Sequence, residues 1–143
     1  MKECLFAFGS NMSRERLEAR IGPVDVRGAA RLVGHRHRFS HEGVDGTGQG
    51  NIEPESDAQV HGVLYQLDPA QFERLDIIQR GYTRTELRVW SLCIPMMAWA
   101  YMAPKQRNVA PPSLSYLEHY RRGIEEHDLP GGYGRWVFSS WDA

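Results

Sequence analysis

A chain of 143 residues has the usual size of one domain, long enough to bury a substantial core and too short for two ordinary domains. Apolar residues make up 41% and charged residues 24% of it, which excludes the weakly hydrophobic composition of disordered chains. The net charge of −1, without a long run of either sign, argues against nucleic acid or an anionic lipid surface as a partner. We therefore expect one globular domain over residues 1–143.

Cysteine usage and hydropathy bear on where the protein works. Cys4 and Cys93 lie far apart and form no Cys-x-x-Cys motif. With no secretory leader in front of them, a reducing cytoplasm is the expected location. The most apolar stretch, residues 94–102, has about half of the roughly 20 residues that a membrane helix requires. It is more typical of a core strand, so no membrane partner is expected.

The N-terminal segment predicts a buried strand, a tight turn and a helix. The apolar run of residues 4–8, CLFAF, ends abruptly at Gly9, Ser10 and Asn11. The following SRERLEAR favours a helix, with Asn11 or Ser13 available as its N-cap. Backbone N–H groups at such a place lack partners and the helix dipole is positive there, so a carboxylate or carbonyl oxygen can bind. Taken alone, an ordinary capped turn explains the pattern better, because such turns are common.

The remaining sequence predicts further strands and helices. Strands are expected at residues 30–39, 59–67, 82–90 and 95–103, and a glycine-rich mobile loop is expected at residues 41–51. Helices are expected from Pro69 to about Gln79, burying Phe72, Leu75 and Ile78, and within residues 111–130, burying Leu114, Leu117 and Ile124. Pro130 and the two glycines after it are expected to close the second of these helices. Strands dominate the first two thirds of the chain, which predicts an α+β fold with a largely antiparallel or mixed sheet.

Four other kinds of site fit the sequence poorly. His35 and His37 fall on one side of a strand and His41 follows, but no Asp, Glu or Cys at useful local spacing completes a metal site. A half-exposed strand with basic residues explains this segment better. Ser10 lacks the second glycine of a Gly-x-Ser-x-Gly nucleophile elbow. Neither a dinucleotide fingerprint nor a phosphate-binding loop follows the first strand.

Several stretches in order resemble the gamma-glutamylcyclotransferase superfamily, the small-barrel group that includes the AIG2-like proteins. FAFGSNMS resembles its glycine-serine-asparagine loop, with Phe8 where Tyr is usual, and LDIIQRGYTRTELRV resembles the helix and strand that carry its catalytic residue. ARLVGHRHRF and GNIEPESDAQVHGVLYQLD are similar to its middle strands, and PPSLSYLEHYRRGIEEHDLP is similar to its closing helix. The resemblance extends from Leu5 to Pro130.

The resemblance implies both a fold and a reaction. The fold is an α+β, small, mostly antiparallel β-barrel flanked by helices, with a cavity at one end. The reaction converts a γ-glutamyl amine, amino acid or peptide into 5-oxoproline and releases the amine. Because the substrate's own α-amino group attacks its γ-carbonyl, the protein mainly holds it bent. No cofactor and no metal are implied, the partner is a small γ-glutamyl molecule, and a monomer or homodimer is expected.

The resemblance also implies the site residues. The end of the first strand and its turn are expected to line the pocket and present backbone amides to substrate oxygens. Tyr116 is expected to close on the glutamyl group, and Tyr82 and Tyr101 to add hydroxyl contacts. The substrate-binding set is thus Leu5, Phe6, Ala7, Phe8, Gly9, Ser10, Asn11, Tyr82, Tyr101 and Tyr116.

One position departs from the family pattern. The family's Leu-Asp-x-x-Glu-Gly places its general acid and base at the glutamate, and this chain has Gln79 there. Glutamine has the same shape but exchanges no proton near neutral pH. Glu53 or Glu86 is then the substitute carboxylate, or the chain is a non-catalytic relative that binds γ-glutamyl ligands, or Gln79 is an introduced Glu→Gln change that traps substrate. The sequence leaves these alternatives open.

Overall fold

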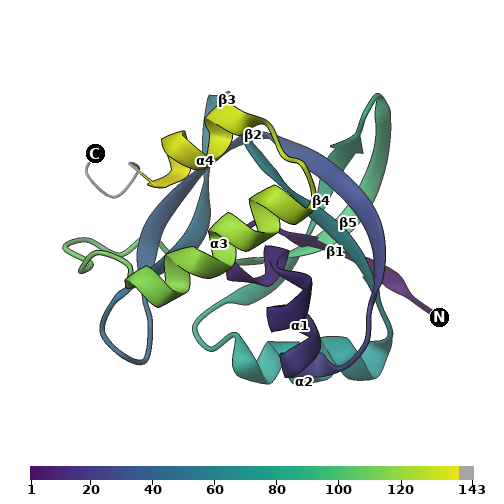
Figure 1. Ribbon diagram of the computed structural model, residues 1–143, viewed down its shortest axis with the longest axis horizontal. Helices are drawn as coiled ribbons and strands as arrows, with labels where there is room; N and C mark the ends of the chain where they lie inside the picture. The colour runs from purple at the N-terminus through teal and green to yellow at the C-terminus, as the bar shows by residue number, and fades with distance from the viewer. Residues whose placement is uncertain (139–143) are drawn as a thin grey trace.

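Five strands close into a barrel in the computed structural model, which describes residues 1–138 (Figure 1). The strand order around the barrel is β1-β3-β2-β4-β5. Every pair is antiparallel except β1 with β5, which run parallel and meet at Leu5 and Trp99. The strands are β1 (Glu3–Ala7), β2 (Asp25–Glu42), β3 (Gly48–Leu67), β4 (Thr83–Ser91) and β5 (Ile94–Met102). The expected small, mostly antiparallel barrel is confirmed.

Helices flank this barrel, as expected. They are the short 3₁₀ turn η1 (Ser10–Met12) and α1 (Arg14–Ile21), α2 (Pro69–Ile78), α3 (Leu114–Glu126) and α4 (Gly131–Phe138). Figure 1 shows α1, α3 and α4 over one side of the barrel, with α2 along its lower end. None of these helices, within residues 1–138, is long and apolar enough to cross a membrane.

Side-chain caps fix where the helices begin. Ser13 accepts a hydrogen bond from the Arg16 N–H at the start of α1, so the predicted cap is confirmed. Asp68 and Gln71 form a reciprocal capping box at the start of α2, each side chain bonding the other's backbone N–H. The caps fix where α1 and α2 begin. These helices follow β1 and β3, so the caps act where the chain leaves the barrel.

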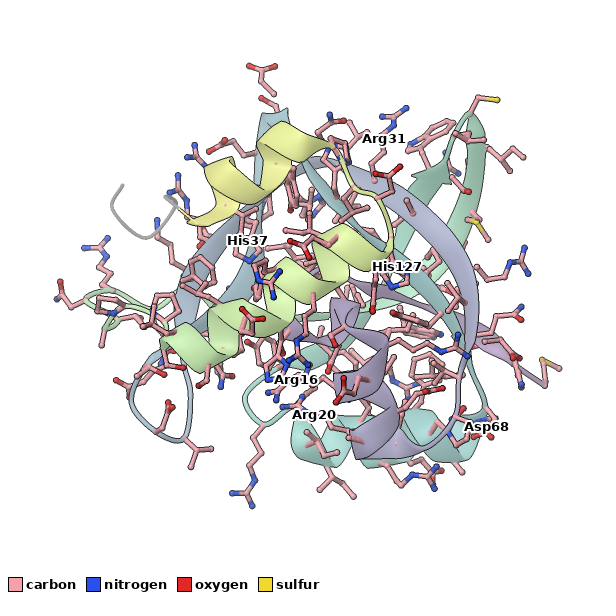
Figure 2. All side chains as sticks on the ribbon, viewed as in Figure 1. Arg16, Arg20, Arg31, His37, Asp68 and His127 are labelled. Atoms are coloured by element: carbon pink, nitrogen blue, oxygen red, sulfur yellow. The ribbon has the colours of Figure 1, made fainter. Side chains whose placement is uncertain are left out.

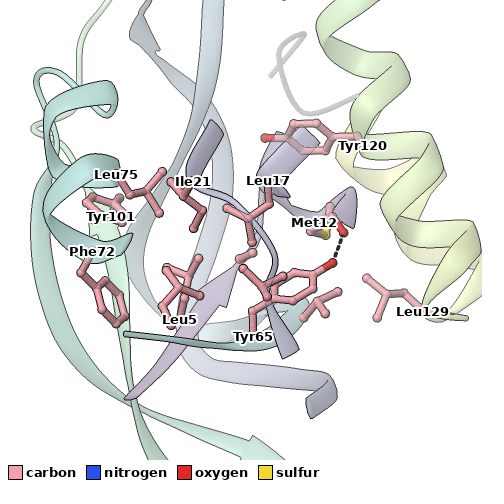
Figure 3. Packing of buried hydrophobic residues seen from close by; sticks show 14 of the residues in the cluster. Leu5, Met12, Leu17, Ile21, Tyr65, Phe72, Leu75, Tyr101, Tyr120 and Leu129 are labelled. Carbon is pink, nitrogen blue, oxygen red and sulfur yellow. Dashed lines mark hydrogen bonds between the residues drawn. The ribbon is translucent and has the colours of Figure 1, made fainter. Parts of the chain in front are cut away.

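Strand β1 and the centre of β3 are buried on both faces, which explains their nearly continuous apolar sequence. Phe6 and Leu64 belong to the core inside the barrel. Leu5 and Tyr65 belong to a second core under the helices, which Figure 3 shows from close by. There the Tyr65 hydroxyl donates to the Met12 carbonyl oxygen at 2.7 Å. The second core therefore ties η1, and with it the turn after β1, to the barrel wall.

The β2–β3 hairpin is longer than the sequence predicts. β2 runs well beyond residues 30–39, and β3 begins at Gly48, inside the segment expected to be a mobile loop. Only residues 43–47 form the turn, closed by a bond from the Gly43 N–H to the Thr47 oxygen. The loop prediction is wrong because the cross-strand ladder, which local glycine content does not reveal, continues almost to the tip.

Two predicted core positions on helices are also wrong. Ile78 is 39% exposed at the end of α2, and Leu114 is 86% exposed as the first residue of α3. The buried face of α3 is instead formed by Tyr120 and Gly123, although Leu117 and Ile124 pack partly against the core as expected. Helix phase, rather than hydrophobicity alone, decides which residue points inward.

Candidate functional site

A cavity opens at the end of β1, with an empty volume of about 470 Å³ including its mouth. The ten predicted substrate-binding residues and Gln79 all lie on its wall. The lining residues are Leu5, Phe6, Ala7, Phe8, Gly9, Ser10, Asn11, Arg16, Arg20, Gln49, Gly50, Gln79, Tyr82, Tyr101 and Tyr116. The cavity wall is therefore formed by β1, η1, α1, the start of β3, the turn between α2 and β4, β5 and α3.

The turn after β1 forms one wall. The backbone oxygen of Gly9 accepts a hydrogen bond from the Met12 N–H at 3.0 Å, and that of Ser10 accepts one from the Ser13 N–H at 3.2 Å. These two bonds form the turn η1. The first N–H groups of such a turn have no acceptor within it, so those of Ser10 and Asn11 are available to a ligand. Gly9 has little room for a side chain, because a Cβ there would lie 3.1 Å from the Tyr120 hydroxyl.

Two arginines of α1 give the cavity its charge. The Nε of Arg16 donates to the Ser10 hydroxyl at 3.0 Å, and the Nη1 of Arg20 donates to the side-chain oxygen Oδ1 of Asn11 at 3.4 Å. Burial, followed by the nearby Arg16 charge, lowers the pKa of Arg20 to about 10. No Asp or Glu is among the described residues that line the cavity. Two half-buried cations without a carboxylate favour an anionic ligand.

Figure 2 shows the guanidinium groups of Arg16 and Arg20 side by side between α3 and the loop that follows α2. Both side chains are only partly buried, whereas Leu5, Ala7 and Tyr101 are at most 4% exposed. The arginines therefore lie toward the open end of the cavity, and β1 and Tyr101 form its floor.

Gln79 ends α2 at the cavity wall. Its N–H donates to the Leu75 oxygen at 2.8 Å, and its own backbone oxygen accepts from the Tyr82 N–H at 3.2 Å. Gly81, between Gln79 and Tyr82, has a φ of +84°, and a Cβ there would overlap the His41 ring. This tight turn places Gln79 and Tyr82 on the same cavity.

Three tyrosines surround the cavity, and their hydroxyls have partners in the protein. Tyr82 donates to the Gly50 oxygen at 2.7 Å, while Tyr116 accepts from the Gly50 N–H at 2.9 Å. Tyr101 donates to Asp76 Oδ1 at 2.7 Å. Burial is the main cause that raises the pKa of each of these phenols, so all three remain neutral hydroxyls at physiological pH.

Neither carboxylate considered as a substitute for the missing glutamate reaches the cavity. Glu53 pairs with Arg38 at 3.5 Å and with Lys105 at 3.9 Å on the barrel wall. Glu86 is exposed on β4, opposite Trp99. Both residues are absent from the cavity lining, so Gln79 has no acidic neighbour there among the described residues.

The histidine segment lies on a half-exposed strand with outward basic residues, as predicted. His37 is on the buried face of that strand, and its Nε2 lies 2.7 Å from the Tyr120 hydroxyl. The flanking arginines do face outward, where Arg36 pairs with Glu55 and Arg38 with Glu53. Within residues 1–138, no three His, Cys, Asp or Glu side chains are grouped so that they could hold a metal ion.

Four cavity residues were missed by the sequence analysis. Arg16 and Arg20 are four positions apart on a helix, a spacing that puts them on one face, so their alignment with the turn was a usable signal. Gln49 and Gly50 had none, because they lie in the segment interpreted as a mobile loop.

The fold defines the chain as a small β-barrel protein with a cavity at one end of the barrel. The sequence profile described as "Gamma-glutamyl cyclotransferase, AIG2-like" matches residues 5–122. The chain belongs to this family. None of the curated protein sequences compared with the chain matches it significantly.

Solved structures share the fold at low sequence identity. One named "Gamma-glutamyl cyclotransferase" is 23% identical, with a TM-score of 0.87 over 95% of this chain and 86% of that one. An uncharacterized protein from Homo sapiens, loc79017, is also 23% identical, with a TM-score of 0.85 over 94% and 85% of the two chains. An aig2-like protein from Mus musculus is 19% identical, with a TM-score of 0.53 over 81% and 82%.

Proposed function

We propose that the cavity binds a γ-glutamyl compound and promotes its cyclisation to 5-oxoproline, with release of the attached amine, amino acid or peptide. The observation that carries the proposal is the composition of the cavity wall. Turn amides, two guanidinium groups and tyrosine hydroxyls meet there with no carboxylate among the described lining residues. Such a wall complements a small molecule rich in carboxylate and carbonyl oxygens.

The reaction needs little from the protein beyond shape and charge. The α-amino nitrogen of the ligand attacks its γ-carbonyl carbon, the new C–N bond closes the ring, and the bond to the departing nitrogen breaks. The attacking nitrogen loses a proton and the departing nitrogen gains one. Both reacting groups belong to one molecule, so holding the ligand bent supplies the proximity. The N–H groups of Ser10 and Asn11 are suited to the carbonyl oxygen as it gains negative charge.

The proton transfer is the step that this cavity supports least. Gln79 carries no group that exchanges a proton near neutral pH. General acid and base catalysis typically contributes about 10²- to 10⁴-fold in rate, so cyclisation here relies on proximity, oxyanion stabilisation and water. A second function, binding of a γ-glutamyl ligand without turnover, is favoured by this same absence of a carboxylate from the described lining residues.

Product and binding measurements together test the proposal. The purified chain is incubated with a γ-glutamyl amine, a γ-glutamyl amino acid and glutathione, and 5-oxoproline is quantified against incubations without protein. Calorimetry is run in parallel with the same compounds. Product above the background supports cyclisation, and saturable binding without product supports the second function. If no compound binds and none is converted, both functions are wrong for these ligands.

A further inference from the structure

A buried chain of three side chains connects the core to the cavity. His37 on β2 and Tyr120 on α3 are both completely buried, and His37 Nε2 lies 2.7 Å from the Tyr120 hydroxyl. The Tyr120 hydroxyl is paired in turn with the hydroxyl of Tyr116, one turn earlier on α3, whose ring centroid lies 5.4 Å from that of Tyr120. Tyr116 lines the cavity, so the chain runs from the core to the ligand space. Figure 2 shows His37 next to α3.

Glycines allow these groups to meet. A Cβ on Gly50 would overlap the Tyr120 hydroxyl and would come within 2.9 Å of His37 Nε2. A Cβ on Gly9 would lie 3.1 Å from the same hydroxyl. The hydroxyl of Tyr120 is therefore enclosed by backbone from β3 and from the turn after β1. Such close packing leaves the rings of His37 and Tyr120 little freedom to rotate.

The other nitrogen of His37 indicates how the protons are arranged. Nδ1 is buried and has no hydrogen-bond partner within residues 1–138. A buried N–H without an acceptor is rarer in proteins than a buried acceptor without a donor, so the proton belongs on Nε2. Burial lowers the pKa of His37 to about 3, which keeps the imidazole neutral at physiological pH.

The direction of the remaining hydrogen bonds follows. If Nε2–H donates to the Tyr120 oxygen, the Tyr120 hydroxyl proton is directed to the Tyr116 oxygen. That oxygen already accepts the Gly50 N–H at 2.9 Å. With both of its lone pairs engaged, the Tyr116 hydroxyl can direct its own proton only into the cavity. Donors in series also polarise one another, which strengthens the last donor of the chain.

We infer that His37 is a positioning residue, which acts through Tyr120 to make the Tyr116 hydroxyl a fixed hydrogen-bond donor to an oxygen of the bound ligand. The identity of the ligand rests on the proposed function, whereas the direction of the hydrogen bonds is a property of the protein alone. Separate experiments test the two.

The tautomer is measured without any ligand. Nitrogen-15 NMR of histidine-labelled protein at neutral pH distinguishes a protonated ring nitrogen from an unprotonated one, and comparison with His37→Gln assigns the signals. The expected result is a protonated Nε2 and an unprotonated Nδ1. A proton on Nδ1 overturns the inference, whatever the protein binds.

Binding of 5-oxoproline, measured by calorimetry, tests the effect on the cavity. His37→Leu, Tyr120→Phe and Tyr116→Phe are each expected to weaken binding about tenfold. His37→Gln retains an N–H donor near the position of Nε2 and is expected to restore most of the affinity. Circular dichroism and thermal unfolding establish that each variant is folded before it is compared.

A double change separates positioning from a general loss of packing. In the Tyr116→Phe background, His37→Leu is expected to leave the affinity for 5-oxoproline unchanged, because the donor on which it acts is gone. An equal further loss in that background overturns the inference. If the unmodified chain binds neither 5-oxoproline nor any γ-glutamyl compound, the proposed function fails, and the NMR result alone decides the direction of the hydrogen bonds.

Discussion

Two arginine side chains give the cavity a positive charge that no acidic side chain among its described lining residues balances. Arg16 and Arg20 are partly buried, and among the described lining residues they face no Asp or Glu. Removing a cation from water without a counter-ion is unfavourable, and the low pKa of Arg20 reflects that. A ligand carboxylate would supply the missing charge.

Arg20→Gln is therefore expected to weaken binding of a γ-glutamyl amino acid by about tenfold, which is roughly 1.4 kcal/mol. Affinity of the unmodified chain is also expected to fall as the pH rises through about 10, because Arg20 loses its proton there. Calorimetry at several pH values measures both effects. Arg27→Gln, on an exposed part of β2, serves as the control, and an equal loss of affinity in that variant would show that only overall charge matters.

His37 should also govern stability in acid. Its pKa is about 3 in the folded protein and about 6.5 when unfolded, so below pH 6.5 the unfolded chain binds more protons. The stability contributed by the neutral imidazole is complete above pH 6.5 and is lost as the pH falls toward 3. The free energy of unfolding is expected to decrease by up to about 1.4 kcal/mol per pH unit from this group.

Urea unfolding at pH 7, 5.5 and 4.5 measures that slope. His37→Gln cannot titrate, so its stability is expected to depend less steeply on pH, even if the variant is less stable at pH 7. Parallel slopes for the two proteins would contradict this assignment.

At the residue scale, the sequence identified most of the cavity because the signal was local. The turn at Gly9 and Ser10 follows an apolar run directly, and the resemblance to a family located Gln79 and Tyr116. The complete burial of His37 was not predicted, because burial of a histidine depends on what packs over the strand. Here Tyr120, 83 positions along the chain, supplies that cover.

The cavity wall depends on the contact between helix α3 and the turn η1. Gly123 lies against the turn after β1, and a Cβ there would come within 2.8 Å of the Met12 carbonyl carbon and closer still to its side chain. Met12 itself is fully buried. A side chain at position 123 would push α3 away from the turn and move Tyr116 with it.

Gly123→Ala is accordingly expected to destabilise the protein by about 1–3 kcal/mol, although alanine is the better helix former by about 1 kcal/mol. Chemical denaturation measures the change. Gly132→Ala, in α4, is the matched control, because a Cβ there meets none of the described atoms within 4 Å, and it is expected to be neutral or slightly stabilising. A stability gain in Gly123→Ala would contradict the close packing described here.

At the element scale, the type of each strand and helix followed from the sequence more readily than its length. The Ser13 cap was readable because it acts on a neighbouring residue. The ends of the β2–β3 hairpin were not, because pairing between Arg38 and Asn51 is set by the partner strand. Helix α4 was missed for a similar reason, since Pro130 and the glycines after it begin a helix that packs against the core.

In the whole molecule, closure of the barrel assembles the cavity from distant segments. Gly50 at the start of β3 is held between Tyr82 and Tyr116, which are 32 and 66 positions away. No local pattern reveals such a contact, so Gln49 and Gly50 could only come from the structure. The same closure keeps Glu53 and Glu86 away from Gln79, which leaves the cavity rich in donors and without a proton acceptor of suitable pKa among its described residues.

The rate of 5-oxoproline formation by the unmodified chain and by Gln79→Glu, from the same γ-glutamyl compounds, tests the central claim most directly. A carboxylate at position 79 is expected to raise the rate by about 10²-fold or more, because it restores general acid and base catalysis. Gln59→Glu, which adds the same charge at an exposed position of β3, should leave the rate unchanged. If Gln79→Glu is folded, binds these compounds and forms product no faster than the unmodified chain, position 79 is not the place of proton transfer and the account of this cavity is wrong.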